Sequence, residues 1–179
     1  MKLANYKACI CEGSEEEAIM DILLDHHLLI FERDEMLEGK VIRCRDGKKF
    51  EDQYLRKGYV DKISIIRILD SRREKYKLSK AYQNKVDVIN IITAPEIEML
   101  IIFHEGKYND FKKSKKSPSD FCKIDLKMRN VKTYDYLKNY FENSAILIKA
   151  IHEYHKISRV QKGEYTLLDL MKCNGKIAE

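Results

Sequence analysis

The fold is decided by the stretch KACICEGSEEE, residues 7–17. It opens with a short apolar run that ends at Glu12-Gly13, a pattern typical of a buried strand followed by a tight turn. Residues 14–17 have the S-x-x-E spacing of a helix capping box, and three consecutive glutamates suit the positive end of a helix dipole. Apolar residues recur at helical spacing over 18–24. We therefore predict a strand, a Glu-Gly turn and a helix over residues 6–29.

Two further strands are predicted along the chain. Residues 62–69 are rich in β-branched side chains and end at Asp70, and residues 86–92 have a similar composition. The segment 93–96, Thr-Ala-Pro-Glu, again has capping spacing, with a proline near the start of the expected helix. Residues 97–104 are apolar nearly all round, which is typical of a buried helix.

The remaining elements are predicted from weaker sequence patterns. Residues 41–44 are a candidate strand, and 50–57 and 79–84 are candidate short helices. Beyond Gly106, we expect a helix with Pro118 at its first position, a long helix from Thr133 to His155 and a short one over 166–172. Strands that alternate with helices favour an α/β fold with a mostly parallel central sheet flanked by helices. We expect residues 1–105 to form this core and residues 106–179 a helical, basic extension packed on it.

Composition excludes several classes of protein. The chain has 179 residues, 35% of them charged, and a net charge of +5, which is a globular and mildly basic composition. No run of 18 uncharged apolar residues is present, so no membrane span is expected, and the apolar run near the start is too short for a signal peptide. We therefore expect a cytoplasmic protein. Five scattered cysteines do not form a disulfide framework, so buried reduced thiols are expected.

Carboxylates follow each predicted strand. Glu12 and Asp70 come directly after the first two strands, and Glu96 and Glu98 follow the third. Sites in parallel sheets gather at the carboxyl ends of strands, and clustered hard oxygen ligands suit Mg²⁺ and phosphoester chemistry.

Each of these acids also has a structural interpretation. Glu12 could stabilise a helix start, Asp70 could be a turn residue, and Glu96 could be a capping residue. Glu98, within an apolar helix, could be a buried acid paired with Arg67 or Lys62. His104 could simply end its helix, where its charge suits the dipole.

Charge is unevenly distributed along the chain. Residues 1–38 hold ten acids and three bases, whereas residues 106–140 hold ten bases and four acids. Aromatic residues lie between those bases, a combination typical of nucleic-acid binding, although a solvated lysine-rich loop would have the same composition. The candidate phosphate-binding residues are Arg72, Arg73, Lys112, Lys113, Lys115 and Lys116.

The strand, Glu12-Gly13 turn and helix, followed by a strand that ends in Asp70, resemble the Toprim family. That resemblance implies Mg²⁺ (or Mn²⁺) held by Glu12 and Asp70 for cleavage of phosphodiester bonds. Arg72 stands where the family has a second aspartate.

A narrower resemblance concerns Pro95, Glu98 and His104 together with residues 11–15, CEGSE, which are similar to RloB-like proteins. This Toprim-related group is found near bacterial restriction and anti-phage loci. The match covers residues 6–105, and the usual asparagine before the proline is Ala94 here. It implies a role in phage defence, a nucleic-acid partner and a partner protein encoded nearby.

Two functions from different classes follow. The first is a Mg²⁺-dependent nuclease in which Glu12 and Asp70 are metal ligands and Glu98 is a third ligand or general base. The alternative is a catalytically inactive, nucleic-acid-binding or regulatory subunit, in which a cation such as Arg72 replaces the charge of the metal. A nucleotide-handling α/β enzyme is disfavoured because neither common glycine-rich phosphate loop is present.

Overall fold

The central element is a parallel sheet. The computed structural model describes residues 2–57, 61–73 and 76–172. Four strands lie in the order β1 (Tyr6–Ile10), β2 (Ile63–Leu69), β3 (Val86–Ile92) and β4 (Glu164–Tyr165), and every neighbouring pair is parallel. One row of the sheet runs through Ile10, Arg67, Asn90 and Glu164. The predicted α/β class with a parallel sheet is confirmed.

Alternation along the strands creates two apolar faces. On one face, Cys9 and Ile66 belong to the same core as the buried side of α1 (Ser14–Asp25). On the other face, Ile10 and Ile65 pack with Phe50 of α2 (Gly47–Gln53).

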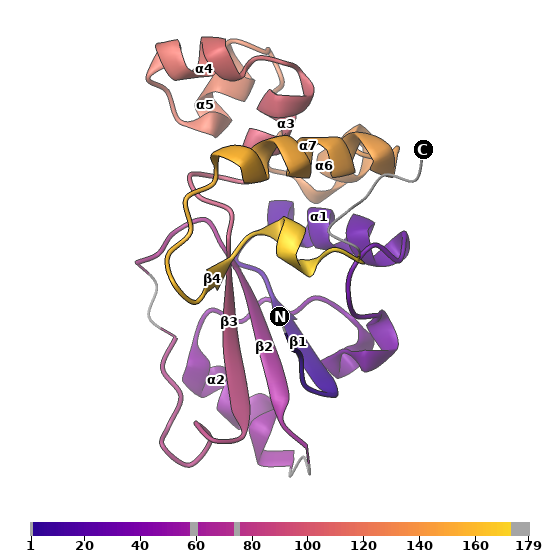
Figure 1. The fold of residues 1–179 in the computed structure, drawn as a ribbon, viewed down its shortest axis with the longest axis vertical. Helices are drawn as coiled ribbons and strands as arrows, with labels where there is room; N and C mark the ends of the chain where they lie inside the picture. The colour runs from indigo at the N-terminus through magenta and orange to yellow at the C-terminus, as the bar shows by residue number, and fades with distance from the viewer. Residues whose placement is uncertain (1, 58–60, 74–75, 173–179) are drawn as a thin grey trace.

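The remaining α-helices follow β3 in the chain, and Figure 1 shows them beyond the carboxyl ends of the strands. They are α3 (Met99–His104), α4 (Tyr108–Ser114), α5 (Pro118–Ile124), α6 (Tyr134–Tyr140) and α7 (Ser144–Ile157). Short 3₁₀ helices complete the described chain: η1 (Arg33–Glu35), η2 (Leu37–Gly39), η3 (Leu55–Lys57) and η4 (Leu167–Leu170).

The helical extension shares its core with the sheet. Buried side chains of α3, α5, α6 and α7 belong to the same apolar cluster as α1 and its face of the sheet. The extension also supplies β4, which pairs with Asn90 and Ile91 of β3. Within the described residues, no helix combines the length and apolar character needed to cross a membrane.

Several predicted elements differ in the structure. The segment 41–44 makes only an isolated bridge, between Ile42 and Ile10, and residues 80–85 form turns where a helix was predicted over 79–84. The expected capping box at 93–96 is absent because the helix begins later, at Met99. The last helix is shortened to the 3₁₀ turn η4.

The long helix predicted from Thr133 to His155 is in fact two helices. It breaks after Tyr140, where Phe141 turns inward and is fully buried. Asn143 then caps α7, because its Oδ1 accepts a hydrogen bond from the backbone N–H of Ala145 at 3.1 Å. An asparagine that satisfies a free N–H at a helix start is a strong beginning signal.

Cysteine usage agrees with the prediction of reduced thiols for the described residues. Cys9, Cys11, Cys44 and Cys122 are free and buried, and Cys173 lies outside the described residues. Burial raises the pKa of the Cys122 thiol to about 12, so this thiol is unreactive near neutral pH.

The break between α6 and α7 is testable. Asn143→Ala should lower the free energy of unfolding by about 1 kcal/mol, because α7 loses its cap. Asn139→Ala, an exposed asparagine on α6, should change it by less than about 0.5 kcal/mol. Urea denaturation of both variants measures the difference, and equal effects would contradict the capping role.

A candidate acidic site at the carboxyl edge of the sheet

The first acids of the site lie in the unit formed by β1, the Glu12-Gly13 turn and α1. Gly13, the N-cap of α1, donates its backbone N–H to Oε2 of Glu16 at 2.9 Å. A Cβ at Gly13 would meet Glu15 Oε2 at 2.5 Å and Glu16 Oε2 at 2.8 Å, so both carboxylates fold back over this turn. Glu12 precedes the turn, and its backbone carbonyl accepts from Arg45 at 3.1 Å.

The predicted capping box of α1 is wrong by one residue. Glu16 reaches back to the N-cap, whereas Glu17 pairs with Arg43 at 2.5 Å. Ser14, expected to be the cap, instead donates its hydroxyl to the backbone carbonyl of Lys132 at 3.0 Å. This bond fastens the segment before α6 to the start of α1.

Lys132 thereby enters the acidic site. Its Nζ lies 3.4 Å from Glu98 Oε1 and 3.8 Å from Glu15 Oε1. Glu98 is only 1% exposed, whereas the side chain of Lys132 is 42% exposed. The lysine is therefore a cation between solvent and a buried acid.

Glu98 is a buried acid, as its structural interpretation predicted, but the cation beside it is Lys132 instead of the predicted Arg67 or Lys62. Lys62 pairs with Asp87 at 3.0 Å, and the Arg67 guanidinium lies 4.6 Å from the centre of the Tyr76 ring. Glu98 is the N-cap residue of α3, and Glu96 accepts at 2.8 Å from the N–H of Ser119, in the first turn of α5.

Two acids of the site have raised pKa values. Burial is the largest cause at Glu16, and the charge of Glu15 adds to it, so the pKa of Glu16 rises to about 7, with a smaller contribution from Asp70. Burial likewise raises the pKa of Glu98, against the lowering effect of Lys132, and the charges of Glu96 and Glu15 add to the rise.

The pKa of Lys132 is raised as well, and for a base this favours the charged form. Burial favours its neutral form, but the surrounding carboxylates, Glu98 first, outweigh that effect and raise its pKa. Acids from all three strand ends thus influence one another electrostatically: Asp70 and Glu15 act on Glu16, and Glu15 and Glu96 act on Glu98.

The donor chemistry suits a hard divalent cation, since carboxylate oxygen is the preferred ligand of Mg²⁺. No three His, Cys, Asp or Glu side chains of the described chain are arranged to hold a metal ion together. Mg²⁺ usually keeps several waters and is bound through one or two carboxylates plus substrate phosphates. Glu12 and Asp70, at the ends of adjacent strands, are residues of this kind.

Arg72 forms an ion pair with Glu164 of β4. Its Nε donates to both carboxylate oxygens of Glu164 at 3.0 Å, and its Nη2 donates to the backbone carbonyl of Arg159 at 2.5 Å. Arg73 is exposed.

His104 ends α3, six residues or about 9 Å of helix rise beyond Glu98. Its ring meets the Tyr140 ring edge-on, with ring centres 5.7 Å apart.

The predicted lysines lie on and after α4, which Figure 1 places, with α5, farthest from the sheet. Lys112 lies 5.7 Å from the centre of the Tyr108 ring, and Lys116 pairs with Asp125 at 2.6 Å. Lys113 is in the last turn of α4, and Lys115 follows it in a left-handed conformation.

The aromatic residues between these bases have packing roles. Tyr108 stacks on Phe103 with ring centres 4.9 Å apart, and Phe111 meets buried Phe121 edge-on at 5.6 Å. Tyr134 donates its hydroxyl to Asp21 at 3.0 Å. These rings stabilise the helical extension.

Three residues of the site were missed from sequence. The sequence predicts a helix-dipole role for Glu15 and Glu16, and includes Glu15 in the CEGSE resemblance, but it predicts neither as a site residue; their position directly after Glu12-Gly13 is the available signal. Lys132 gave no signal, because its contact with Ser14 spans 118 residues of chain.

The raised pKa of Glu16 predicts a pH-dependent stability. The folded protein holds this proton more tightly than the unfolded chain, so the resulting stability is full below about pH 4.5 and is lost as the pH rises to about 7. Relative to wild type, Glu16→Gln should therefore gain about 3 kcal/mol in free energy of unfolding between pH 4.5 and 7.5.

Denaturation at a series of pH values measures this gain. Glu17→Gln, on the same helix but paired with Arg43, is the control and should show no such relative gain over the same range. If the free energy of unfolding of Glu16→Gln varied with pH in parallel with that of the wild type, the raised pKa of Glu16 would be contradicted.

Comparison with known proteins gives no relative: no family model, curated protein or solved structure matches the chain. The functional conclusion therefore rests on the geometry of the acidic site.

Proposed function

We propose that this chain is a Toprim-like protein that acts on nucleic acid, with Glu12 and Asp70 as ligands of a Mg²⁺ (or Mn²⁺) ion used for phosphodiester hydrolysis. One observation carries the proposal. Acids that follow three adjacent parallel strands are gathered on one edge, and two of them are buried with raised pKa values. Burying carboxylates beside one another is unfavourable, and groups whose pKa is shifted by burial together with neighbouring charges are typical of functional sites.

In this proposal Glu98 and Lys132 have separate roles beside the metal ion. A bound Mg²⁺ would polarise a phosphoryl oxygen and orient water. Glu98 suits a general base, because a carboxylate whose pKa is raised accepts a proton more readily near neutral pH. Lys132, half-exposed beside Glu98, can contact a phosphate at the mouth of the site. A role in phage defence, in RloB-like fashion, is part of the same proposal.

A second candidate is a catalytically inactive subunit that binds nucleic acid. Lys132 favours it, because its ammonium group already supplies a positive charge between Glu15 and Glu98. In that case the lysine compensates the acids permanently, and the departure at Arg72 reflects a structural pairing with Glu164.

Cleavage of labelled DNA and RNA in Mg²⁺ or Mn²⁺ tests the first candidate. Asp70→Asn and Glu12→Gln should each lower the cleavage rate at least about 100-fold, since each removes a charged metal ligand, while circular dichroism shows an intact fold. Asp61→Asn is the matched control, because Asp61 precedes β2 and lies at the other end of the strand, where its Oδ2 accepts a hydrogen bond from Nδ2 of Asn5 at 3.0 Å. Unchanged cleavage by Asp70→Asn would overturn the assignment.

Calorimetric titration with Mn²⁺ separates the two candidates. The nuclease predicts a heat of binding that disappears in Asp70→Asn. The inactive subunit predicts no binding by the wild type and a binding heat that appears in Lys132→Met, because the acids then lack their internal cation. Lys138→Met is the control for Lys132→Met, since Lys138 pairs with Asp25 at the far end of α1.

A further inference from the structure

We infer that nucleic acid binds at a second basic surface, the basic rim, formed by Arg73, Arg159 and Lys162 beside Asp70. The inference rests on the proposed action on nucleic acid and names where its phosphate backbone lies. Sequence patterns favoured Arg72, Arg73 and the lysines at 112–116, whereas the rim joins Arg73 to Arg159 and Lys162 of a distant segment.

Arg72 assembles the rim. It donates to both carboxylate oxygens of Glu164 at 3.0 Å and to the backbone carbonyl of Arg159 at 2.5 Å. Glu164 also accepts from the N–H of Gln161 at 2.8 Å. The segment 158–164 is thereby held against the segment that follows β2.

The rim charges are available to a partner. Arg73, Arg159 and Lys162 are exposed, and their side chains make no hydrogen bond or ion pair with any other residue that the structure describes. Arg72 differs, because Glu164 balances its charge. Exposed and unbalanced cations attract a polyanion over several ångströms and bind phosphates.

The rim adjoins the acidic edge. Arg73 is three residues from Asp70, and Glu164 pairs with Asn90 in the carboxyl half of β3. Tyr154, whose hydroxyl donates to the carbonyl of Ala94 just after β3, is close enough to Arg72 for that cation to oppose the rise of its pKa caused by burial. A phosphate backbone on the rim therefore passes the end of β2, where Asp70 lies.

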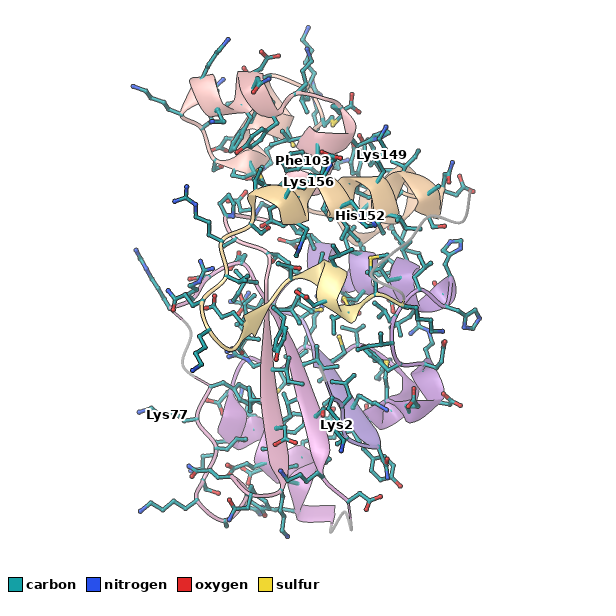
Figure 2. The ribbon with its side chains drawn as sticks, in the orientation of Figure 1. Lys2, Lys77, Phe103, Lys149, His152 and Lys156 are labelled. Carbon is teal, nitrogen blue, oxygen red and sulfur yellow. The ribbon has the colours of Figure 1, made fainter. Side chains whose placement is uncertain are left out.

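Other basic surfaces are less suited. Lys116 is neutralised by Asp125, and α4 lies at the end of the molecule farthest from the sheet. Figure 2 shows Lys149, His152 and Lys156 along α7, but Lys156 is paired with Glu153 at 2.6 Å.

Fluorescence anisotropy in EDTA tests the rim, with fluorescein-labelled single-stranded and duplex DNA and RNA as probes. Arg73→Gln, Arg159→Gln and Lys162→Gln combined should weaken binding at least tenfold. The slope of log affinity against log salt should fall by about 0.9 for each duplex phosphate that the variant no longer neutralises, or by about 0.7 for each phosphate of a single strand. The matched control combines Lys112→Gln, Lys113→Gln and Lys115→Gln, which removes the same charge from α4 and should leave the slope unchanged.

The outcomes separate the rim from the nuclease. Loss of binding in the α4 variant alone, equal losses in both variants, or no binding by the wild type would each overturn the rim. Binding in EDTA that depends on the rim, without cleavage in Mg²⁺, would instead support the rim and reject the nuclease. Circular dichroism confirms folding, and single substitutions at Arg159 and Lys162 replace the triple variant if its fold is lost.

Discussion

Parallel pairing of β1, β2 and β3 is the constraint on which the rest of the molecule depends. Because the three strands run in one direction, whatever follows each of them meets at a single edge of the sheet. The sequence places Glu12, Asp70 and the Glu96–Glu98 segment there. An antiparallel arrangement would have sent Asp70 to the opposite end of the molecule.

Gathering acids at one edge has an energetic cost, which the chain offsets with two backbone N–H groups and one lysine. The N–H of Gly13 binds Glu16, the N–H of Ser119 binds Glu96, and Lys132 lies between Glu15 and Glu98. The offset is incomplete, because Glu16 and Glu98 keep raised pKa values. Burial is the largest cause of both rises, and repulsion between the acids adds to it. A bound divalent cation would relieve both effects, which links the fold to the proposed chemistry.

Sequence patterns predicted the elements that depend on interactions between neighbouring residues in the chain. The stretch 7–17 specified β1, the turn and α1 because its apolar run, glycine and glutamates act on neighbours in the chain. Long-range contacts had no such signal: Lys132 reaches Ser14, Arg72 reaches Glu164, and β4 has only two residues. The prediction of one long helix was wrong because α6 ends at Tyr140 and a second helix, capped by Asn143, follows it with nearly the same apolar spacing. The site was therefore predictable as a set of acids, and Arg73 of the rim was predicted as well, but Lys132, Arg159 and Lys162 were not.

The central claim is that the carboxyl edge holds a divalent cation. Anomalous diffraction from crystals grown with Mn²⁺ would locate the ion directly. The account predicts an anomalous peak in contact with carboxylate oxygens of Glu12 and Asp70. A structure in excess Mn²⁺ with the carboxylates of this edge bound only to protein groups, and no ion among them, would contradict it.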